Sequence, residues 1–182
     1  MKQHILPAIR LTLVLMILCV GIYPLLLSGF ARLTPEKGSG EKITDGNGKS
    51  YYANIGLRFD TTIYFNSRPS AVTYNAAGSG GSNKGPNNPD YLKEVQQRVD
   101  DFKQKNPGVS IPADIVTASG SGLDPDISVA AANAQVARIA AARKLSQQTV
   151  QQLVNKSIDR PFFGPQKINV LKLNIGLDQL SH

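Results

Sequence analysis

The chain has 182 residues, which is enough for one domain and a short additional segment. Its formal net charge is +7, from 20 Lys and Arg residues against 13 Asp and Glu residues, but the basic residues are scattered along the chain. Dense contact with nucleic-acid phosphates is therefore not expected, because it needs clusters of five or six basic residues.

The few cysteine and histidine residues exclude several kinds of site. Cys19 is the only cysteine, and His4 and His182 are the only histidines. One cysteine cannot form an intrachain disulfide or a zinc site built on cysteine pairs. Histidines at the chain ends leave no internal base for Ser-His-Asp or Cys-His catalysis. We expect no metal site and no catalytic residues.

An uncharged, mostly aliphatic run occupies residues 11–31, after a short segment at 1–10. A helix of that length reaches about 30 Å, the thickness of the hydrocarbon core of a bilayer. The run therefore predicts a transmembrane helix. Pro24 lies inside it and is expected to kink the helix, because proline cannot donate a backbone hydrogen bond.

A cleaved signal peptide is the alternative interpretation of the same run. Lys2 and Arg10 would form its basic end, and Gly29-Phe30-Ala31 its cleavage site. The run is longer than a signal core of about 7–15 residues, so we predict a retained anchor. The basic residues before the span, with no acid before Glu36, favour a cytoplasmic N-terminus and a domain outside the cytoplasm.

Small residues in the predicted helix suggest a packing face. Gly21 and Gly29 are eight residues apart, a little over two turns, with Ser28 beside them and Pro24 between them. Small residues let a partner helix approach closely in lipid. The alternative is that these glycines are merely tolerated in a lipid-facing helix.

The segment after the anchor is rich in Gly, Ser and charge, and residues 32–50 are predicted to be a linker or a hairpin with a turn at 45–48. Residues 51–182 are predicted to form a small soluble domain. The Tyr, Thr, Ile and Phe residues at 50–65 favour one or two strands. Residues 75–89 have too much Gly, Asn and Pro for regular structure.

Helix signals follow in the second half of the chain. Asn88 is a good N-cap for a helix that ends at 106–108. Ser128 can cap a helix through about Leu145, and Ser146 can cap another. Short strands are expected at 111–116 and at 168–174. The predicted fold is thus a single N-terminal transmembrane helix followed by a small mixed α/β extracytoplasmic domain.

Three patterns resemble known binding motifs but favour structural roles. The Gly/Ser loops at 78–82 and 117–122 could cradle an anion, but neither ends in the Gly-Lys-Ser/Thr of a Walker loop. Asp124 and Asp126 lack the rest of a calcium loop, so Asp124 is expected to turn the chain. Residues 138–154 are spaced like a helix-turn-helix, but their second helix offers glutamines and little positive charge.

Together, several ordered segments resemble the C chain of the Kdp-type potassium-transporting ATPase, over nearly the whole chain. They are Arg68-Pro69-Ser70-Ala71, Ser79-Gly80-Gly81-Ser82-Asn83, Gly85-Pro86-x-Asn88-Pro89, Thr117-Ala118-Ser119-Gly120-Ser121-Gly122-Leu123-Asp124-Pro125 and Asn169-Val170-Leu171-x-Leu173-Asn174. The chain departs from the pattern of that family at Ser67, Lys84 and Val129, and these departures concern loop geometry. Within these loops we expect Arg68, Pro69, Ser70, Ser82, Asn83, Ser119, Gly120 and Asp124 to have partner-binding or structural roles.

The resemblance implies an accessory subunit of an ATP-driven potassium uptake complex in the bacterial inner membrane. Its partners would be a P-type ATPase subunit and a potassium-channel-like subunit, and its role would be to stabilise their assembly. The chain lacks the Asp-Lys-Thr-Gly-Thr motif of P-type pumps, so it is not expected to be an enzyme. A stand-alone anchored binding protein for an extracytoplasmic ligand is the alternative.

The resemblance also implies a link to nucleotide. Members of the family have been described as catalytic chaperones that raise the ATP affinity of the pump subunit, and Gln135 matches the family glutamine that could contact nucleotide. ATP is cytoplasmic, so this role fits poorly with an external domain. We expect no cofactor on this chain alone, and ATP only together with the pump subunit.

Overall fold

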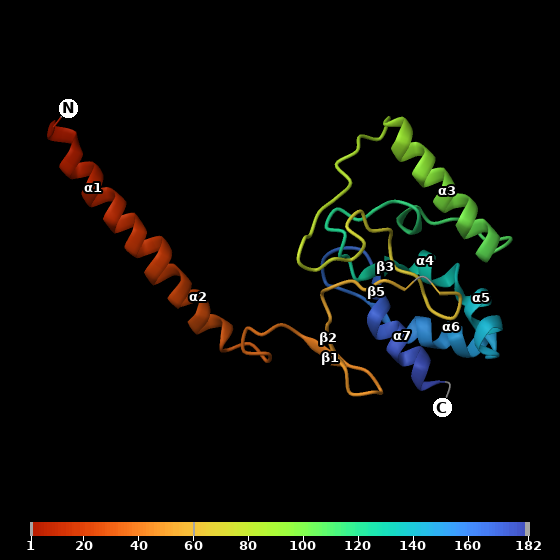
Figure 1. Cartoon of the computed structure of the whole chain (residues 1–182). Coiled ribbons are helices and arrows are strands. Elements are labelled where there is room, and N and C mark those ends of the chain that lie inside the picture. The colour runs from red at the N-terminus through yellow and green to blue at the C-terminus, as the bar shows by residue number, and fades with distance from the viewer. Residues whose placement is uncertain (1, 60, 181–182) are drawn as a thin grey trace. The chain divides into compact units, whose positions relative to one another are not determined.

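The computed structural model describes residues 2–59 and 61–180. The chain divides into two compact units, Met1–Glu41 and Lys42–His182. The first contains a long apolar helix, and the second is a small α/β region with a two-stranded and a three-stranded sheet (Figure 1). This confirms the predicted combination of an apolar helix with a small α/β domain, while its placement outside the cytoplasm stays a prediction.

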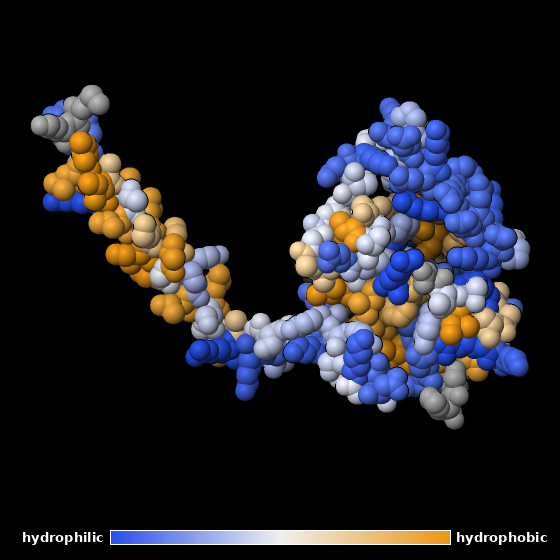
Figure 2. Space-filling view, in the orientation of Figure 1, coloured by the Kyte–Doolittle hydropathy of each residue, from blue (hydrophilic) through white to orange (hydrophobic). Residues whose placement is uncertain are grey.

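The first unit is helical from Lys2 to Ala31. It comprises α1 (Lys2–Met16), the π-helical segment η1 (Ile17–Ile22) and α2 (Tyr23–Ala31). The stretch Gln3–Ala31 is long and apolar enough to cross a membrane, and no part of its most apolar window is buried within the protein. Figure 2 shows apolar side chains along this helix, whereas hydrophilic residues predominate on the visible face of the second unit.

The disturbance expected at Pro24 takes the form of a π-helical turn. The backbone N–H of Tyr23 donates to the carbonyl of Leu18, five residues earlier. Pro24 has no N–H, and its ring would clash with the carbonyl four residues before it in a regular α-helix. The wider π turn directly before Pro24 relieves that conflict without ending the helix.

The second unit opens with a hairpin of β1 (Lys42–Thr44) and β2 (Ser50–Tyr52). Asp45 shapes its turn, because its Oδ1 accepts hydrogen bonds from the backbone N–H groups of Asn47 and Lys49, both at 2.9 Å. The bond from Lys49 is the main reason why the pKa of Asp45 is lowered. The turn predicted at 45–48 is confirmed, and the hairpin interpretation holds for this part of the predicted linker.

Of the one or two strands predicted over 50–65, one forms, β2, and the described residues after it are irregular. Side chains from distant helices satisfy this backbone instead. The Asn174 amide accepts from the Phe65 N–H at 2.9 Å and donates to the Phe65 carbonyl at 3.0 Å, as a neighbouring strand would. Arg138 also donates to the Tyr64 carbonyl at 3.1 Å.

The helix α3 (Pro89–Lys105) begins as predicted, because Asn88 Oδ1 accepts from the N–H groups of Asp90 and Tyr91. The strand expected at 111–116 is wrong. This stretch contains the 3₁₀ turn η2 (Ala113–Ile115), in which the Ile115 N–H donates to the Pro112 carbonyl at 3.2 Å. Proline lacks the N–H of a central strand and has the φ of a turn, which explains the difference.

The three-stranded sheet is antiparallel, with β5 (Lys167–Asn169) between β3 (Asp126–Ser128) and β4 (Ile158–Asp159). The strand predicted over 168–174 ends at Asn169. There the Asn169 side chain accepts from the Lys172 N–H at 3.0 Å and caps α7 (Val170–Gln179). A capping side chain at that point favours a helix over a continued strand.

The helix predicted from Ser128 to Leu145 is in fact two helices, α4 (Val129–Asn133) and α5 (Val136–Arg143). Ser128 and Ser146 cap α4 and α6 (Gln147–Lys156), as predicted. One core joins α4–α7 to the sheet, and it includes Phe65, Phe102, Ile127, Ile139, Val150, Val154, Ile168, Leu173 and Leu177. In Figure 1, α3 lies on one side of this sheet and α7 on the other.

Candidate functional site

Two neighbouring loops meet a third that lies far from them in sequence, all on the second unit. The Ser119 N–H donates to the Pro69 carbonyl at 3.0 Å, and the Ser70 hydroxyl donates to the Gly122 carbonyl at 2.7 Å. The Gly80 N–H donates to the Ser121 carbonyl at 2.9 Å. The segments 68–74, 78–82 and 119–124, here called the loop cluster, therefore hold one another through hydrogen bonds from backbone and serine hydroxyl groups rather than through an apolar core.

Gly122 is the tightest position in the loop cluster. Its φ is +67°, a conformation that costs other residues free energy. A Cβ atom at Gly122 would lie 2.5 Å from Val72 Cγ2 and 2.8 Å from the Gly80 carbonyl oxygen. Only glycine fits there without moving the neighbouring loops, which accounts for one of the glycines in the Gly/Ser run at 117–122.

Asp124 joins two segments of the loop cluster through an ion pair with Arg68. Its Oδ1 accepts from the Asp126 N–H at 3.0 Å, the turn role predicted for it, and its Oδ2 pairs with Arg68 Nη1 at 2.9 Å. Both side chains are about one-quarter exposed, so the ion pair is partly shielded from solvent. Arg68 Nε is buried and has no hydrogen-bond partner among the described residues.

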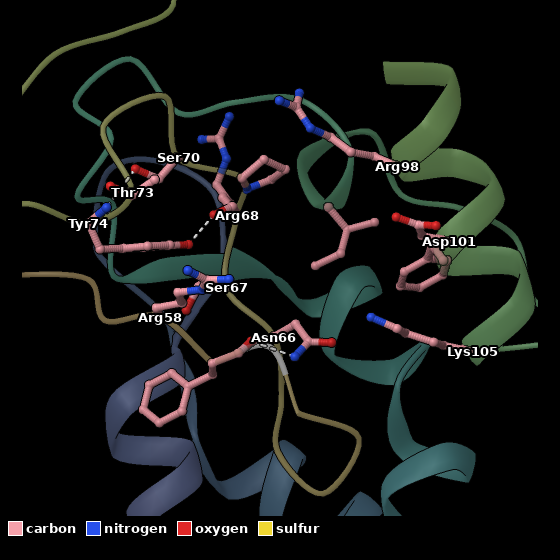
Figure 3. A pocket seen from close by; sticks show the side chains of 14 residues that line it. Arg58, Asn66, Ser67, Arg68, Ser70, Thr73, Tyr74, Arg98, Asp101 and Lys105 are labelled. Carbon is pink, nitrogen blue, oxygen red and sulfur yellow. Dashed lines mark hydrogen bonds between the residues drawn. The ribbon is translucent and has the colours of Figure 1, made fainter. Parts of the chain in front are cut away.

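A cleft of about 410 Å³ opens between the loop cluster and α3 (Figure 3). Its walls carry more basic than acidic side chains, and Figure 3 shows Arg68 and Arg98 extending toward the same opening. The lining residues are Arg58, Phe59, Asn66, Ser67, Arg68, Pro69, Ser70, Thr73, Tyr74, Arg98, Asp101, Phe102, Lys105 and Ile115. Such a lining suits an anionic or hydrogen-bonding group better than a cation.

Tyr74 contributes a neutral hydroxyl group to the wall of the cleft. Its hydroxyl donates to the Arg68 carbonyl, as Figure 3 shows. Burial of the phenol raises the pKa of Tyr74 to about 12, and the nearby Asp124 carboxylate adds to the effect. The Tyr74 hydroxyl therefore stays protonated over the physiological pH range, and its hydrogen bond holds the backbone of Arg68 in place.

Gln135 lies behind the cleft wall with a side chain that is 0% exposed. Its Oε1 accepts from the Asn66 N–H and from Arg138 Nη2, both at 2.8 Å. Its Nε2 donates to the Ala131 carbonyl at 3.1 Å. The amide thus holds Asn66, a lining residue, in place. Contact between Gln135 and a nucleotide would require the segment around Asn66 to move away. The nucleotide contact predicted for Gln135 stays a prediction.

Arg138 completes the support of the wall. Besides Gln135, its guanidinium donates to Asn106 Oδ1 at 3.1 Å and to the carbonyls of Thr62 and Tyr64. Burial lowers the pKa of Arg138 to about 10, so the group remains charged at neutral pH. A cation that gathers several carbonyl oxygens fixes the irregular 61–66 segment in the absence of a β-ladder.

Seven of the eight motif residues predicted to matter, all but Asn83, lie in the loop cluster. Arg68, Pro69 and Ser70 line the cleft, and Ser119, Gly120 and Asp124 support it from the loop cluster. Ser82 and Asn83 are outside the described lining. Asn83 has a φ of +52°, as expected for a turn. Gly21, Pro24, Ser28 and Gly29 lie in the other unit, in η1 and α2.

Sequence reasoning missed the basic side of the cleft. Arg98, Phe102 and Lys105 line it from α3, and their spacing of three or four residues places them on one helix face. That periodicity was available in the sequence. The sequence could not show that this face of α3 lies opposite the Arg68 loop, because that arrangement depends on the tertiary fold.

Comparisons with known proteins agree over nearly the whole length of the chain. The family model described as "KdpC: K+-transporting ATPase, c chain" matches residues 5–179. A protein of Flavobacterium psychrophilum is 49% identical, over 98% of this chain and 99% of its own length. Proteins of Flavobacterium johnsoniae and Geobacter metallireducens are 48% and 46% identical over similar shares. All three carry the name potassium-transporting ATPase KdpC subunit.

Proposed function

The chain belongs to the KdpC family, whose members are subunits of the potassium-transporting ATPase, and we propose that it is a non-catalytic accessory subunit that stabilises assembly of the complex. Its partners would be a P-type pump subunit and a potassium-channel-like subunit. The observation that carries the proposal is the family match over residues 5–179, which spans the unburied apolar helix and the domain together.

The helix is proposed to be a retained single-pass anchor in the inner membrane. Its large side chains are exposed throughout, for example Val20 at 72% and Leu25 at 73%. Apolar surface of this extent is stable in hydrocarbon and unfavourable in water. The basic residues before the span support a cytoplasmic N-terminus and a domain outside the cytoplasm.

Protease protection tests this topology. Protease added to intact spheroplasts should digest the domain, and a cytoplasmic protein followed in the same sample should stay intact until lysis. Protection of the domain until lysis would reverse the proposed orientation. A mature chain that begins at Arg32 or Leu33 would show instead that the helix is a removed signal.

The anchor is proposed to take part in assembly through its small residues. A Cβ atom built on Gly21 or Gly29 would meet none of the described atoms within 4 Å, apart from the helix's own nearby backbone, so no other described part of this chain fills the space beside them. Lipid tails are as apolar as leucine, so specific helix association needs close packing or polar contact. Pro24 and Ser28 would shape the same region.

The double substitution Gly21→Leu and Gly29→Leu keeps the helix apolar and should insert normally, but should be lost from the purified complex. Val14→Leu together with Val20→Leu is the matched control, because it adds bulk without removing small residues. Co-purification of the glycine double variant at the wild-type level, with normal potassium uptake, would remove this role from the anchor.

The proposal also predicts that the purified chain does not hydrolyse ATP. It has neither the phosphorylated motif of P-type pumps nor a complete Walker loop. Steady hydrolysis that persists after every trace of pump subunit is removed would contradict the non-catalytic role. Failure to co-purify with any membrane partner would favour the alternative, a stand-alone anchored binding protein.

The basic cleft favours a second candidate function, that of a catalytic chaperone that raises the ATP affinity of the pump subunit. Phosphate groups would suit Arg68 and Arg98, with Gln135 behind them. We rank it second because the domain is proposed to lie outside the cytoplasm. Arg98→Gln should weaken the apparent ATP affinity of the assembled complex if this role is real, whereas Arg160→Gln, an exposed control, should not. Equal affinities would remove the role.

A further inference from the structure

Two neighbouring phenylalanines are almost completely exposed on the domain. Phe162 is 92% exposed and Phe163 is 86% exposed, more than any other large apolar side chain described in either unit. Their rings pack edge to face, with centroids 4.7 Å apart, so they shield one another only slightly and cover no part of the core. Single exposed apolar residues are ordinary, but an adjacent aromatic pair of this exposure marks an interaction site.

The loop that carries the pair is short and firmly mounted. Residues 160–166 connect β4 to β5, and at its base Ile158 pairs with Ile168 and Asp159 with Lys167. Ile168 is 0% exposed, so the base is fixed in the core. Pro161 and Pro165 restrict the backbone on either side of the aromatic pair. The backbone that carries the two rings therefore has less conformational freedom to lose on binding than an unrestricted loop.

We propose that the Phe162–Phe163 loop inserts its two rings into the interfacial region of the lipid bilayer in which the chain is anchored. The inference rests on the proposed membrane anchor. The pair forms a projecting tip and not a groove, and a tip fits a deformable apolar medium without a matching pocket. Aromatic and apolar side chains beside basic ones are the usual composition of such interfacial contacts.

Charge and chain length both favour lipid as the occupant. The segment 160–166 contains Arg160 and no acidic residue, so it suits the anionic headgroups of a bacterial membrane. Residues 32–41 separate the anchor from the second unit and can span at most about 35 Å. A domain of this size has a radius of gyration of about 14 Å. The tether thus keeps the domain close to the bilayer.

The absence of tryptophan from the chain allows a direct test. Phe162→Trp in the full-length protein introduces a single tryptophan at an exposed position where the fold does not constrain it. In vesicles of phosphatidylcholine and phosphatidylglycerol, its emission should shift to shorter wavelength. A spin label near the lipid headgroups should quench it more than a label near the bilayer centre. Adding Phe163→Ser to the same chain should reduce that quenching.

Leu92→Trp on α3 is the matched control, because Leu92 is 53% exposed and far from the loop in sequence. Its emission should stay that of tryptophan in water. Water-like emission from Trp at position 162 in chains that float with the vesicles would overturn the inference and leave the anchor intact. An emission shift that appears only in the purified complex, with no quenching by the lipid spin labels, would overturn the inference in favour of a protein partner. Failure of the chain to float would overturn the anchor as well.

Discussion

Gln135→Ala separates a structural role for this side chain from a nucleotide-binding one. The substitution removes an amide that is 0% exposed and is hydrogen-bonded on both of its polar atoms. The Asn66 N–H, which donates to Oε1 at 2.8 Å, loses that acceptor inside the domain. We therefore expect destabilisation of the domain even when no nucleotide and no partner subunit is present.

The magnitude follows from the contacts that are lost. A buried donor without a partner costs about 1–3 kcal/mol, and the cavity left by the shorter side chain adds about 1 kcal/mol. Together they predict a loss of about 2–4 kcal/mol in the free energy of unfolding. For a domain of this size, that loss lowers the unfolding midpoint by about 10 °C.

Thermal unfolding of the full chain in detergent, followed by circular dichroism, measures the effect. Gln152→Ala is the matched control, because Gln152 is an exposed glutamine on α6 and its replacement should leave the midpoint nearly unchanged. If Gln135→Ala unfolds within a degree or two of the wild type, the structural reasoning is refuted. An altered ATP affinity of the complex without loss of stability would then point to nucleotide contact.

Two further predictions concern the loop cluster. Gly122→Ala should destabilise the domain by about 3 kcal/mol or more, because the added Cβ meets Val72 and Gly80 at a positive φ. Gly120→Ala is the control and should cost less than about 1 kcal/mol, because a Cβ there meets open space. Similar thermal unfolding midpoints for the two variants would contradict this prediction. Burial raises the pKa of Tyr74 to about 12, so its phenol ionises in the unfolded chain at a lower pH than in the folded domain. The contribution of Tyr74 to the free energy of unfolding should therefore be complete below about pH 10. It should fall by up to about 2 kcal/mol as the pH rises to about 12. Denaturant unfolding should therefore show the wild type losing stability relative to Tyr74→Phe over that range, and parallel profiles would rule out this role.

The sequence alone determined those elements whose signals are local. The apolar run at 11–31 lies within an unburied helix, because its length and composition leave few other structures. Asn88, Ser128 and Ser146 each cap the helix that follows, because a capping oxygen needs only N–H groups two or three residues away. The ordered Gly, Ser and Pro motifs likewise identified the family, which the match over 5–179 confirms.

Tertiary structure decided everything that depended on distant partners. The residues around Phe65 have the composition of a strand, yet their backbone bonds go to Asn174 and Arg138, more than seventy residues away. The cleft likewise exists because the Arg68 loop and the Arg98 face of α3 lie opposite one another. Periodicity and composition describe only neighbours along the chain. They cannot tell which side chain will satisfy a given backbone group, because that choice is made when the core packs.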